Sequence, residues 1–475
     1  MDALVILAIG MIVVIGGILG LKLHPFLALV LGAISVSLLT TDAHIRKYAE
    51  SKNMPKEKTE KLISDLSSQT TGTKIANGLG QTAGKIGILI AMAAIIGKCL
   101  LDSGAAERIV RSTLNLLGEK RAPAAFMGSG FILGVPVYFD TVFYLMIPLA
   151  KSVAAKIGKN FGLYTMAIIA GATMAHSLVP PTPGPLLVAE MLKVDIGKMI
   201  LGGLVVGGFT LITGYFYAAW ANKKFPIPLR DSADVTVEEL EKASKKDIKE
   251  LPPLWLSILP IALPVFLIAG NTILPKIIEN SEANRGVLGL IKFFGNKDIA
   301  LTISAFIALW MLARQIKDRK KLGEAVQKAL SGAGMIILIT AAGGAFGGIL
   351  QQTGIGPYIK ELAESYHISI LPLAFFVTTL IRTAQGSATV AMITSVGIFS
   401  TMTSSLAFDP LYLALAIGCG SKPFPWMNDS GFWVICKMSG MTEKETLKTS
   451  STLMSLMALS GLVFIMIVSS IIPNF

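Results

Sequence analysis

The sequence predicts an all-α integral membrane protein with about ten to fourteen membrane segments, some of them re-entrant hairpins and broken helices. Two observations predict this class. Of the 475 residues, 53% are hydrophobic, and the mean hydropathy of +0.66 exceeds that of soluble domains. Apolar runs long enough to cross about 30 Å of hydrocarbon also recur along the chain. These runs occupy residues 3–22, 25–40, 84–101, 162–178, 198–220, 254–273, 299–313, 331–351 and 450–472.

Two further apolar regions, 122–150 and 369–428, are interrupted by glycine, proline and polar residues. An unwound backbone in hydrocarbon leaves N–H and C=O groups without partners, so a break persists only where protein, water or a ligand satisfies it. A half-helix that starts at a break points free N–H groups and a partial positive charge into the cavity. The pattern therefore favours a cavity for an organic anion.

The formal net charge of +12 arises from 42 Lys and Arg residues against 30 Asp and Glu residues. The cations lie in loops between apolar runs, as the positive-inside rule expects, so we infer a lipid environment and no nucleic-acid partner. Cys99, Cys419 and Cys436 lie in or beside apolar runs at wide spacings. This spacing predicts neither a disulfide framework nor a metal site.

Basic loops set the expected orientation in a bacterial inner membrane. Residues 221–250 and 314–330 are basic and are separated by two spans, so both are expected in the cytoplasm with 274–298 outside. Counting from these loops places 105–160 in the cytoplasm. It places the loop 41–80 and both chain termini in the periplasm.

The two halves of the chain contain an internal repeat with the same order of features and opposite expected orientations. Such an inverted repeat is typical of secondary transporters, whose paired breaks mark the binding site. Glycine and proline that merely kink helices would explain one break, but not four paired ones rich in polar groups. The corresponding strings are IGKCLLDSGAAERIV (96–110) with FGGILQQTGIGPYIK (346–360), GVPVYFDT (134–141) with RTAQGSAT (382–389), and HSLVPPTPGP (176–185) with GSKPFPWMNDSG (420–431).

The repeat divides the chain into five parts, and each repeat is expected to contain one hairpin and one broken helix. The parts are N-terminal scaffold helices and a loop at 1–80, repeat 1 at 81–220, a cytoplasmic linker at 221–252, connecting helices at 253–330 and repeat 2 at 331–475. The hairpins are expected at about 122–150 and 369–408, and the broken helices at about 162–190 and 410–433.

Four strings, GVPVYFDTVFYLMIPLA, HSLVPPTPGPLLVAE, RTAQGSATVAMITSVG and NDSGFWVICKMSGMTEKETLKT, resemble the gluconate permease family of sugar-acid/proton symporters. The likeness extends over nearly the whole chain. It implies an elevator-type transporter with two hairpins, a mobile transport domain and a scaffold that forms a homodimer. It also implies import of gluconate or a related sugar acid with a proton. Another carboxylate, such as a hydroxy acid or D-serine, and sodium coupling remain alternatives.

The sequence departs from the family pattern at four positions. Asp140 stands where the family commonly has Glu, and Thr182 where many members have His. Trp426 replaces a usual His, and Lys422 adds a cation where an apolar residue is common. These departures leave the substrate and the coupling ion less defined than the fold.

Three ionisable residues in apolar surroundings are candidates for ion coupling or charge pairing. Asp140 is expected to relay a proton, contact the substrate or cap the half-helix that follows it. Arg382 could grip a carboxylate with two hydrogen bonds, but we favour a brace to a buried acid. His176 could titrate near neutral pH, although a lone membrane histidine is more often structural.

The remaining candidates lie at the breaks. Ser387 and Thr389 are expected to contact substrate hydroxyls or the carboxylate, and Gly386 allows close backbone approach. Lys422 could add a fixed charge, neutralise Asp140 or Asp429, or snorkel to the interface. The further substrate-binding candidates are Tyr138, Thr141, Thr182, Gln385, Ser421 and Asn428.

Enzymatic classes find little support. No phosphate-binding P-loop, H-E-x-x-H or G-x-S-x-G string occurs, so we expect no ATP-driven transport, no hydrolase and no cofactor or metal. An intramembrane enzyme would need a catalytic pair, for which Asp140 and Asp429 are the one combination worth testing. A channel is the third class, and it would conduct without saturable accumulation.

Overall fold

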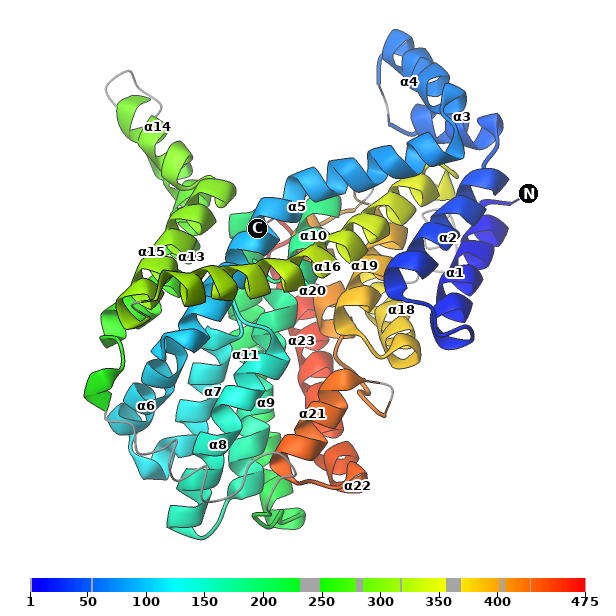
Figure 1. Ribbon diagram of the computed structural model, residues 1–475. Coiled ribbons are helices and arrows are strands. Elements are labelled where there is room, and N and C mark those ends of the chain that lie inside the picture. Colours follow the sequence, from blue (N-terminus) through cyan, green and yellow to red (C-terminus); the bar gives the residue numbers. More distant parts are fainter. Residues whose placement is uncertain are drawn as a thin grey trace.

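The structure is a computed structural model that describes residues 2–52, 54–230, 248–278, 285–316, 318–355, 369–400, 403, 406–427 and 429–474. Within these residues the regular secondary structure is entirely helical, which confirms the all-α class (Figure 1). Seven of the described helices are long and apolar enough to cross a membrane, or eight if one bent pair counts as a span. The expected ten to fourteen segments therefore include pieces that do not cross as one helix.

The helices coincide closely with the apolar runs. Most of these helices are continuous because their runs contain no helix-breaking residues. Helix-internal prolines occur in α13, where the helix continues past them. The long spans are α5 (Thr71–Asp102), α11 (Ile196–Lys224), α13 (Leu254–Ile277), α15 (Lys297–Gln315), α16 (Arg319–Gln351) and α23 (Thr452–Ile471), with the shorter α1 (Ala3–Leu19) and α2 (Pro25–Leu39) at the N-terminus.

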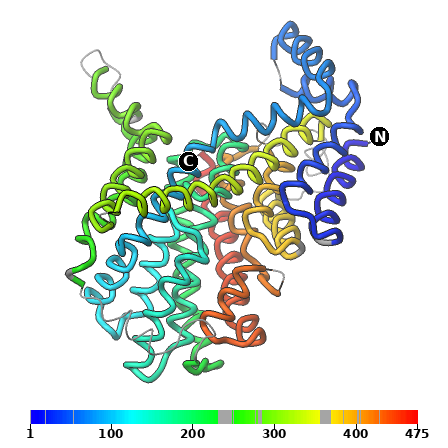
Figure 2. Tube along the Cα trace, in the orientation of Figure 1, coloured from blue at the N-terminus to red at the C-terminus, as the bar shows by residue number. Residues whose placement is uncertain are grey.

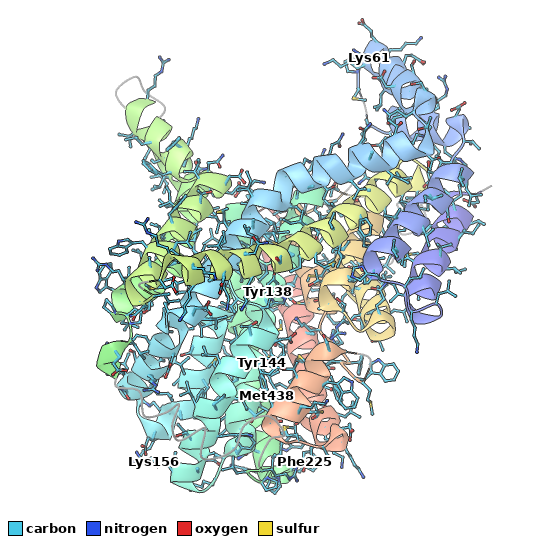
Figure 3. All side chains as sticks on the ribbon, in the orientation of Figure 1. Lys61, Tyr138, Tyr144, Lys156, Phe225 and Met438 are labelled. Carbon is cyan, nitrogen blue, oxygen red and sulfur yellow. The ribbon has the colours of Figure 1, made fainter. Side chains whose placement is uncertain are left out.

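The segment 41–80, expected as a loop between spans, is largely helical. It contains α3 (Asp42–Glu50), α4 (Lys56–Ser68) and the beginning of α5. These helices are polar on their outer faces, and Lys61 of α4 points away from the bundle (Figure 3). Apolar run length alone could not reveal them, because only a narrow stripe that includes Ile45 and Ile63 is buried.

The longest helices, α5 and α16, lie side by side and run in opposite directions across the molecule (Figure 1). Their backbones approach closely because small residues face each other. A Cβ atom added at Gly78 would lie 2.8 Å from the Ala345 Cα, and one at Gly344 would lie 2.1 Å from Thr82 Oγ1. The expected part boundaries at 80 and 330 fall inside these two helices.

Along the chain, each of the two helices α5 and α16 precedes one hairpin, and a broken helix comes after that hairpin. The first hairpin is α7 (Ala122–Leu133) with α8 (Phe139–Ile157), and the first broken helix is α9 (Phe161–Leu178) with α10 (Pro183–Met191). The second hairpin is α18 (Ile370–Gln385) with α19 (Ala388–Phe399), and the second broken helix is α20 (Pro410–Gly420) with α21 (Ser430–Ser439).

The remaining elements connect these parts. They are α6 (Ala105–Leu117), η1 (Glu119–Arg121), η2 (Ile248–Glu250), α14 (Arg285–Phe294), α22 (Glu443–Thr446) and the π-helical turn η5 (Leu447–Ser451). Large apolar side chains are exposed on the outer helices, as on α13, where Phe266 is 74% exposed. Such exposure suits a surface that faces lipid rather than water.

Several connecting segments lie at two opposite ends of the molecule. Helices α3, α4 and α14 project at one end, together with the N-terminus, whereas α22 and the turn after α8 lie at the other (Figures 1 and 2). The C-terminal Pro473 accepts a hydrogen bond from the Asp409 N–H at 2.8 Å, and Asp409 pairs with Lys198 at the start of α11. The side of the membrane that each end faces stays a prediction.

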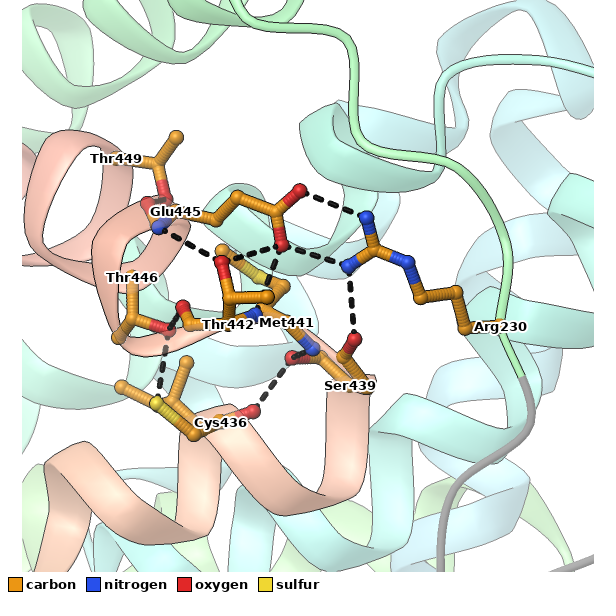
Figure 4. A network of polar contacts seen from close by, with 10 residues as sticks. Arg230, Cys436, Ser439, Met441, Thr442, Glu445, Thr446 and Thr449 are labelled. Carbon is orange, nitrogen blue, oxygen red and sulfur yellow. Dashed lines mark hydrogen bonds and ion pairs between the residues drawn. The ribbon is translucent and has the colours of Figure 1, made fainter.

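One ion pair joins the linker after α11 to the second half of the chain (Figure 4). Arg230 donates to both carboxylate oxygens of Glu445 at 2.6 and 2.8 Å, and to the Gly440 carbonyl at 3.0 Å. Glu445 also accepts the Thr442 N–H at 2.8 Å, which completes a capping box at the start of α22. A bidentate pair fixes orientation as well as distance, so it holds this turn in place.

The packing of α9 against α7 yields a stability prediction. A Cβ added at Gly171 would lie 2.2 Å from the Met127 carbonyl oxygen, a backbone atom that cannot rotate away. We expect Gly171→Ala to lower the free energy of unfolding by about 1–3 kcal/mol. Thermal unfolding of the purified protein in detergent measures the effect. Gly128→Ala on α7 is the matched control, because no atom lies within 4 Å of an added Cβ there; equal stability of the two variants would contradict this packing.

Candidate functional site

Four helix N-termini face one cavity of about 320 Å³. They belong to the second helix of each hairpin, α8 and α19, and to the second half of each broken helix, α10 and α21. A cavity of this size falls at the lower end of small-molecule sites. The lining residues are Tyr138, Phe139 and Asp140 of α8, Pro183 of α10, Ser387, Ala388, Thr389 and Val390 of α19, Asp429, Ser430, Gly431 and Ile435 of α21, with Thr173, His176, Ile336, Ile339, Thr340, Arg382, Gly386, Lys422 and Met454.

The breaks follow from local sequence. Pro183 and Pro185 can begin a helix but cannot continue one, so α10 starts at the proline run. In the second hairpin, Gly386 adopts the left-handed conformation with φ +75°, which ends α18 and lets Ser387 cap α19. Tyr138, labelled near the middle of the view in Figure 3, is partly buried and lines the cavity at the start of α8. The starts of α8, α19 and α21 thus place backbone N–H groups at the cavity, whereas α10 meets it through Pro183, which has no N–H, and contributes its partial positive charge.

The Asp140 carboxylate lies beside the first turn of α21. A methyl group added at Gly431 would lie 3.6 Å from Asp140 Oδ1 and 3.3 Å from Asp429 Oδ1. The two acids therefore flank one backbone position although they come from different halves of the chain. Asp140 accepts no hydrogen bond within the described part of the chain, so its carboxylate is open to a ligand or a proton.

Arg382 forms the brace that the sequence analysis favoured. Its guanidinium forms a buried ion pair with Asp429 Oδ2, and its Nε donates to the Ser421 carbonyl at 3.0 Å. Asp429 also accepts the Gly431 N–H at 2.7 Å and so caps α21. These contacts tie the second hairpin to the second broken helix. Arg382 Nη1 is buried without a partner among the described residues, and the side chain lines the cavity.

Lys422 lies in the break between α20 and α21 and is 5% exposed, so it does not snorkel to the surface. Its ammonium makes no hydrogen bond or ion pair with any residue that the structure describes. It does lie within electrostatic range of Asp140, Asp429 and Arg382. The side chain lines the cavity, where a buried cation without a close partner favours an anionic ligand.

His176 lines the same cavity from α9. Its ring meets the Tyr138 ring edge to face, with centroids 5.8 Å apart. Its Nδ1 atom is buried and has no hydrogen-bond partner among the described residues. A buried imidazole nitrogen without a protein partner is available to a ligand or a water molecule.

The hydroxyl groups divide into two sets. Ser387 accepts the Val390 N–H at 3.3 Å and lines the cavity together with Thr389. Thr182 instead donates to the Val179 carbonyl at 2.8 Å and is buried outside the cavity. Ser421 is likewise buried, and donates to the Gly418 carbonyl at 2.7 Å. These two hydroxyls therefore support their own breaks.

Three further candidates are also placed elsewhere or lie outside the described residues. Thr141 faces a separate space between α5, α8 and α16, and not the main cavity. The amide of Gln385 is buried without a partner among the described residues, and it does not line the cavity. Asn428 lies outside the described residues.

Sequence reasoning missed several residues that line the cavity away from the breaks themselves. Thr173 lies three positions before His176, and helical spacing could have identified it. Ile336, Ile339 and Thr340 come from α16, whose sequence contains no break near them. Only the three-dimensional crossing of α16 over the breaks brings them to the site.

Residues 60–472 match the family described as GntP family permease. The chain belongs to the GntP permease family. The gluconate permease of Pseudomonas aeruginosa is 33% identical over 476 residues, covering 99% of this chain and 98% of that protein. The Gnt-II system L-idonate transporter of Escherichia coli is 28% identical over 470 residues, covering 99% of each. The chain is therefore a multi-pass membrane permease and not an enzyme, which confirms the resemblance.

The fold is also similar to that of a solved transporter. MtrF of Neisseria gonorrhoeae, described with a class of antimetabolite efflux pumps, superposes with a TM-score of 0.63 at 16% identity and covers 83% of each chain. At this level of identity the likeness concerns the fold alone. It agrees with the arrangement of hairpins and broken helices described above.

The Arg382 brace yields a prediction. Arg382→Met leaves Asp429 as a buried charge without its partner, and we expect a loss of about 3–5 kcal/mol in the free energy of unfolding. Arg382→Met combined with Asp429→Asn removes both charges and should recover part of this loss, since Asn can still cap α21. Thermal unfolding compares the two, with the exposed Arg319→Met as control. A double variant no more stable than the single one would contradict the brace.

Proposed function

We propose that the protein is a secondary active transporter that imports gluconate or a related small sugar acid by proton symport. The convergence of four helix N-termini on one cavity with charged and hydroxyl side chains in its lining is the observation that carries this proposal. Their N–H groups and partial positive charges suit a carboxylate, as at other helix termini that bind anions. Arg382 and Lys422 add cationic charge to the same space.

The polar lining supports a hydroxylated substrate. Ser387 and Thr389 lie at one helix start. Thr173 of α9 and Thr340 of α16 also line the cavity, but each donates to a carbonyl of its own helix, at 2.6 and 2.7 Å, so its oxygen can only accept from a substrate. Hydroxyl groups placed around a carboxylate site can donate to and accept from the hydroxyls of a sugar acid. The names of the relatives, a gluconate permease and an L-idonate transporter, support the same class.

The second candidate is a transporter of another carboxylate, such as a hydroxy acid or D-serine, with proton or sodium coupling. The buried Lys422 favours this alternative, because it changes the charge of the cavity relative to the family pattern. We prefer the sugar acid because the six hydroxyl side chains in the cavity lining exceed what a short acid would use.

We propose an elevator mechanism for the transport step. The two hairpins and two broken helices surround the cavity together, which supports their moving as one domain past scaffold helices that include α16. Asp140 and His176, which line the cavity, are the proposed proton carriers, and sodium is the alternative. A homodimer in the bacterial inner membrane, with both termini in the periplasm and the two repeats inverted, completes the proposal.

Uptake by proteoliposomes tests the function. Purified protein in liposomes should accumulate labelled gluconate under an inward proton gradient, with saturation and with collapse after a protonophore. An inward sodium gradient imposed without a pH difference should give no more uptake than liposomes without any gradient. Unlabelled gluconate, L-idonate, lactate and D-serine compete in parallel. Accumulation driven by sodium, or competition by lactate alone, would contradict the proposed ion or substrate.

The second hairpin is tested by removing its two hydroxyls. We expect Ser387→Ala with Thr389→Ala to raise the KM for gluconate by about tenfold, since each lost hydrogen bond is worth roughly 0.5–1.5 kcal/mol. Ser469→Ala with Ser470→Ala, near the end of α23, is the control, because these hydroxyls bond their own helix. Unchanged kinetics in the first variant would exclude this hairpin from substrate binding.

A further inference from the structure

Two cations and two anions line the cavity within the described part of the chain. Arg382 and Asp429 form an ion pair, so their charges cancel locally. Lys422 and Asp140 remain, and each acts on the other electrostatically without a direct contact between their charged atoms. With both ionised, the empty cavity carries no net charge, and the gap between them can accept a third charged group.

The groups that face the Lys422 ammonium come from five different elements. The neutral imidazole of His176 and the thiol of Cys419 add no charge at neutral pH in their ordinary forms. Lys422 is therefore the one cation in the described lining that has no paired acid. The five groups are Arg382 on α18, Asp429 at the start of α21, Asp140 on α8, Cys419 on α20 and His176 on α9.

We propose that Lys422 is the counterion of the transported carboxylate and that Asp140 carries the coupling proton, so that the site is neutral both empty and loaded. This inference rests on the proposed function and names its substrate charge and its stoichiometry. In the loaded state a proton from the water has bonded to an Asp140 oxygen, and the carboxylate of the substrate faces Lys422. Both leave on the other side, and the original charge pair is restored.

Charge neutrality then explains why anion and proton move together. A site that holds the substrate alone carries one excess negative charge, and a site that holds the proton alone carries one excess positive charge. Moving an uncompensated charge through hydrocarbon is unfavourable, so only the empty and the fully loaded sites cross readily. The rule gives one proton per anion and selects monoanions, because a dianion would leave the loaded site negative.

The Asp140→Asn variant tests neutrality of the loaded site separately from neutrality of the empty site. It leaves the loaded site neutral and the empty site positive, so exchange of labelled for unlabelled gluconate should persist while proton-driven accumulation falls by about tenfold or more. Any remaining net uptake should be driven by an inside-positive potential, set with potassium and valinomycin. Asp140→Glu keeps the proton site and should keep the coupling.

Lys422→Met removes the counterion of the carboxylate. Both exchange and accumulation should fall by about tenfold or more, and the KM for gluconate should rise. Asp65→Asn and Lys61→Met on α4 are the matched controls, since both side chains are exposed and lie far along the chain from the cavity residues. In wild-type protein, accumulation should be indifferent to the imposed potential.

Proton counting supplies a readout that does not depend on transport. When gluconate binds to the wild-type protein in weakly buffered detergent solution, the protein should take up about one proton per occupied site. The Asp140→Asn variant should take up none. If the wild-type protein transports gluconate but the Asp140→Asn variant still takes up the proton, this inference is wrong while the proposed function stands. The proton carrier would then be another group, such as His176. Wild-type protein that moves none of the tested acids would overturn the proposed function and this rule with it.

Discussion

The arrangement depends on one constraint: four interruptions of helical backbone must be kept away from lipid. Each interruption frees N–H and C=O groups that hydrocarbon cannot satisfy. Gathering the interruptions in the centre solves this problem for all four at once. The span that contains the first break, Phe161–Met191, is 94% buried, whereas the unbroken Leu254–Pro275 and Lys297–Gln315 are each 39% buried. The broken helices form the core, and the unbroken outer spans separate them from lipid.

The same gathering creates the electrostatics of the site. Four helix starts in one cavity concentrate positive potential, and acids at a helix start are stabilised by it. Asp140 and Asp429 both occupy such positions, on α8 and α21. Their partners differ, because Asp429 is held by Arg382 and by the Gly431 N–H, while Asp140 faces the cavity with no hydrogen bond in the described part of the chain. The two acids lie at similar positions at helix N-termini, but Asp429 is suited to bracing and Asp140 to exchanging a proton with the solvent.

Much of this could be predicted from the sequence, because apolar length and backbone-breaking residues are local properties. The spans, the hairpins and the breaks followed from them, and so did Tyr138, Ser387 and Lys422 as residues near the cavity. The direction of each side chain at a break could not be predicted, since it depends on dihedral angles that the letters do not fix. Thr182 and Ser421 therefore bond their own segments instead of facing the cavity. The contribution of α16 was also out of reach, because it arises from a crossing between distant parts of the chain.

That crossing decides how the site could move under the proposed mechanism. Helix α16 lines the cavity through Ile336, Ile339 and Thr340 without belonging to any break. Further along, it meets α19 at Gly347, where an added Cβ would lie 2.8 Å from the Gly397 Cα. The two facing glycines allow close backbone contact, and one turn earlier the Ile393 side chain of α19 packs over Gly343 of α16, where an added Cβ would lie 1.8 Å from Ile393 Cγ2. Polar contacts lie within the broken segments, as at the Arg382 brace, and also between them and the long helices, since Glu190 of α10 pairs with Lys85 of α5 at 3.1 Å and with Lys297 of α15 at 3.2 Å. Under the proposed mechanism, displacement of the core as one body would keep the Arg382 brace and the charges of the cavity together, and it would have to break the pairs that Glu190 makes with Lys85 and Lys297.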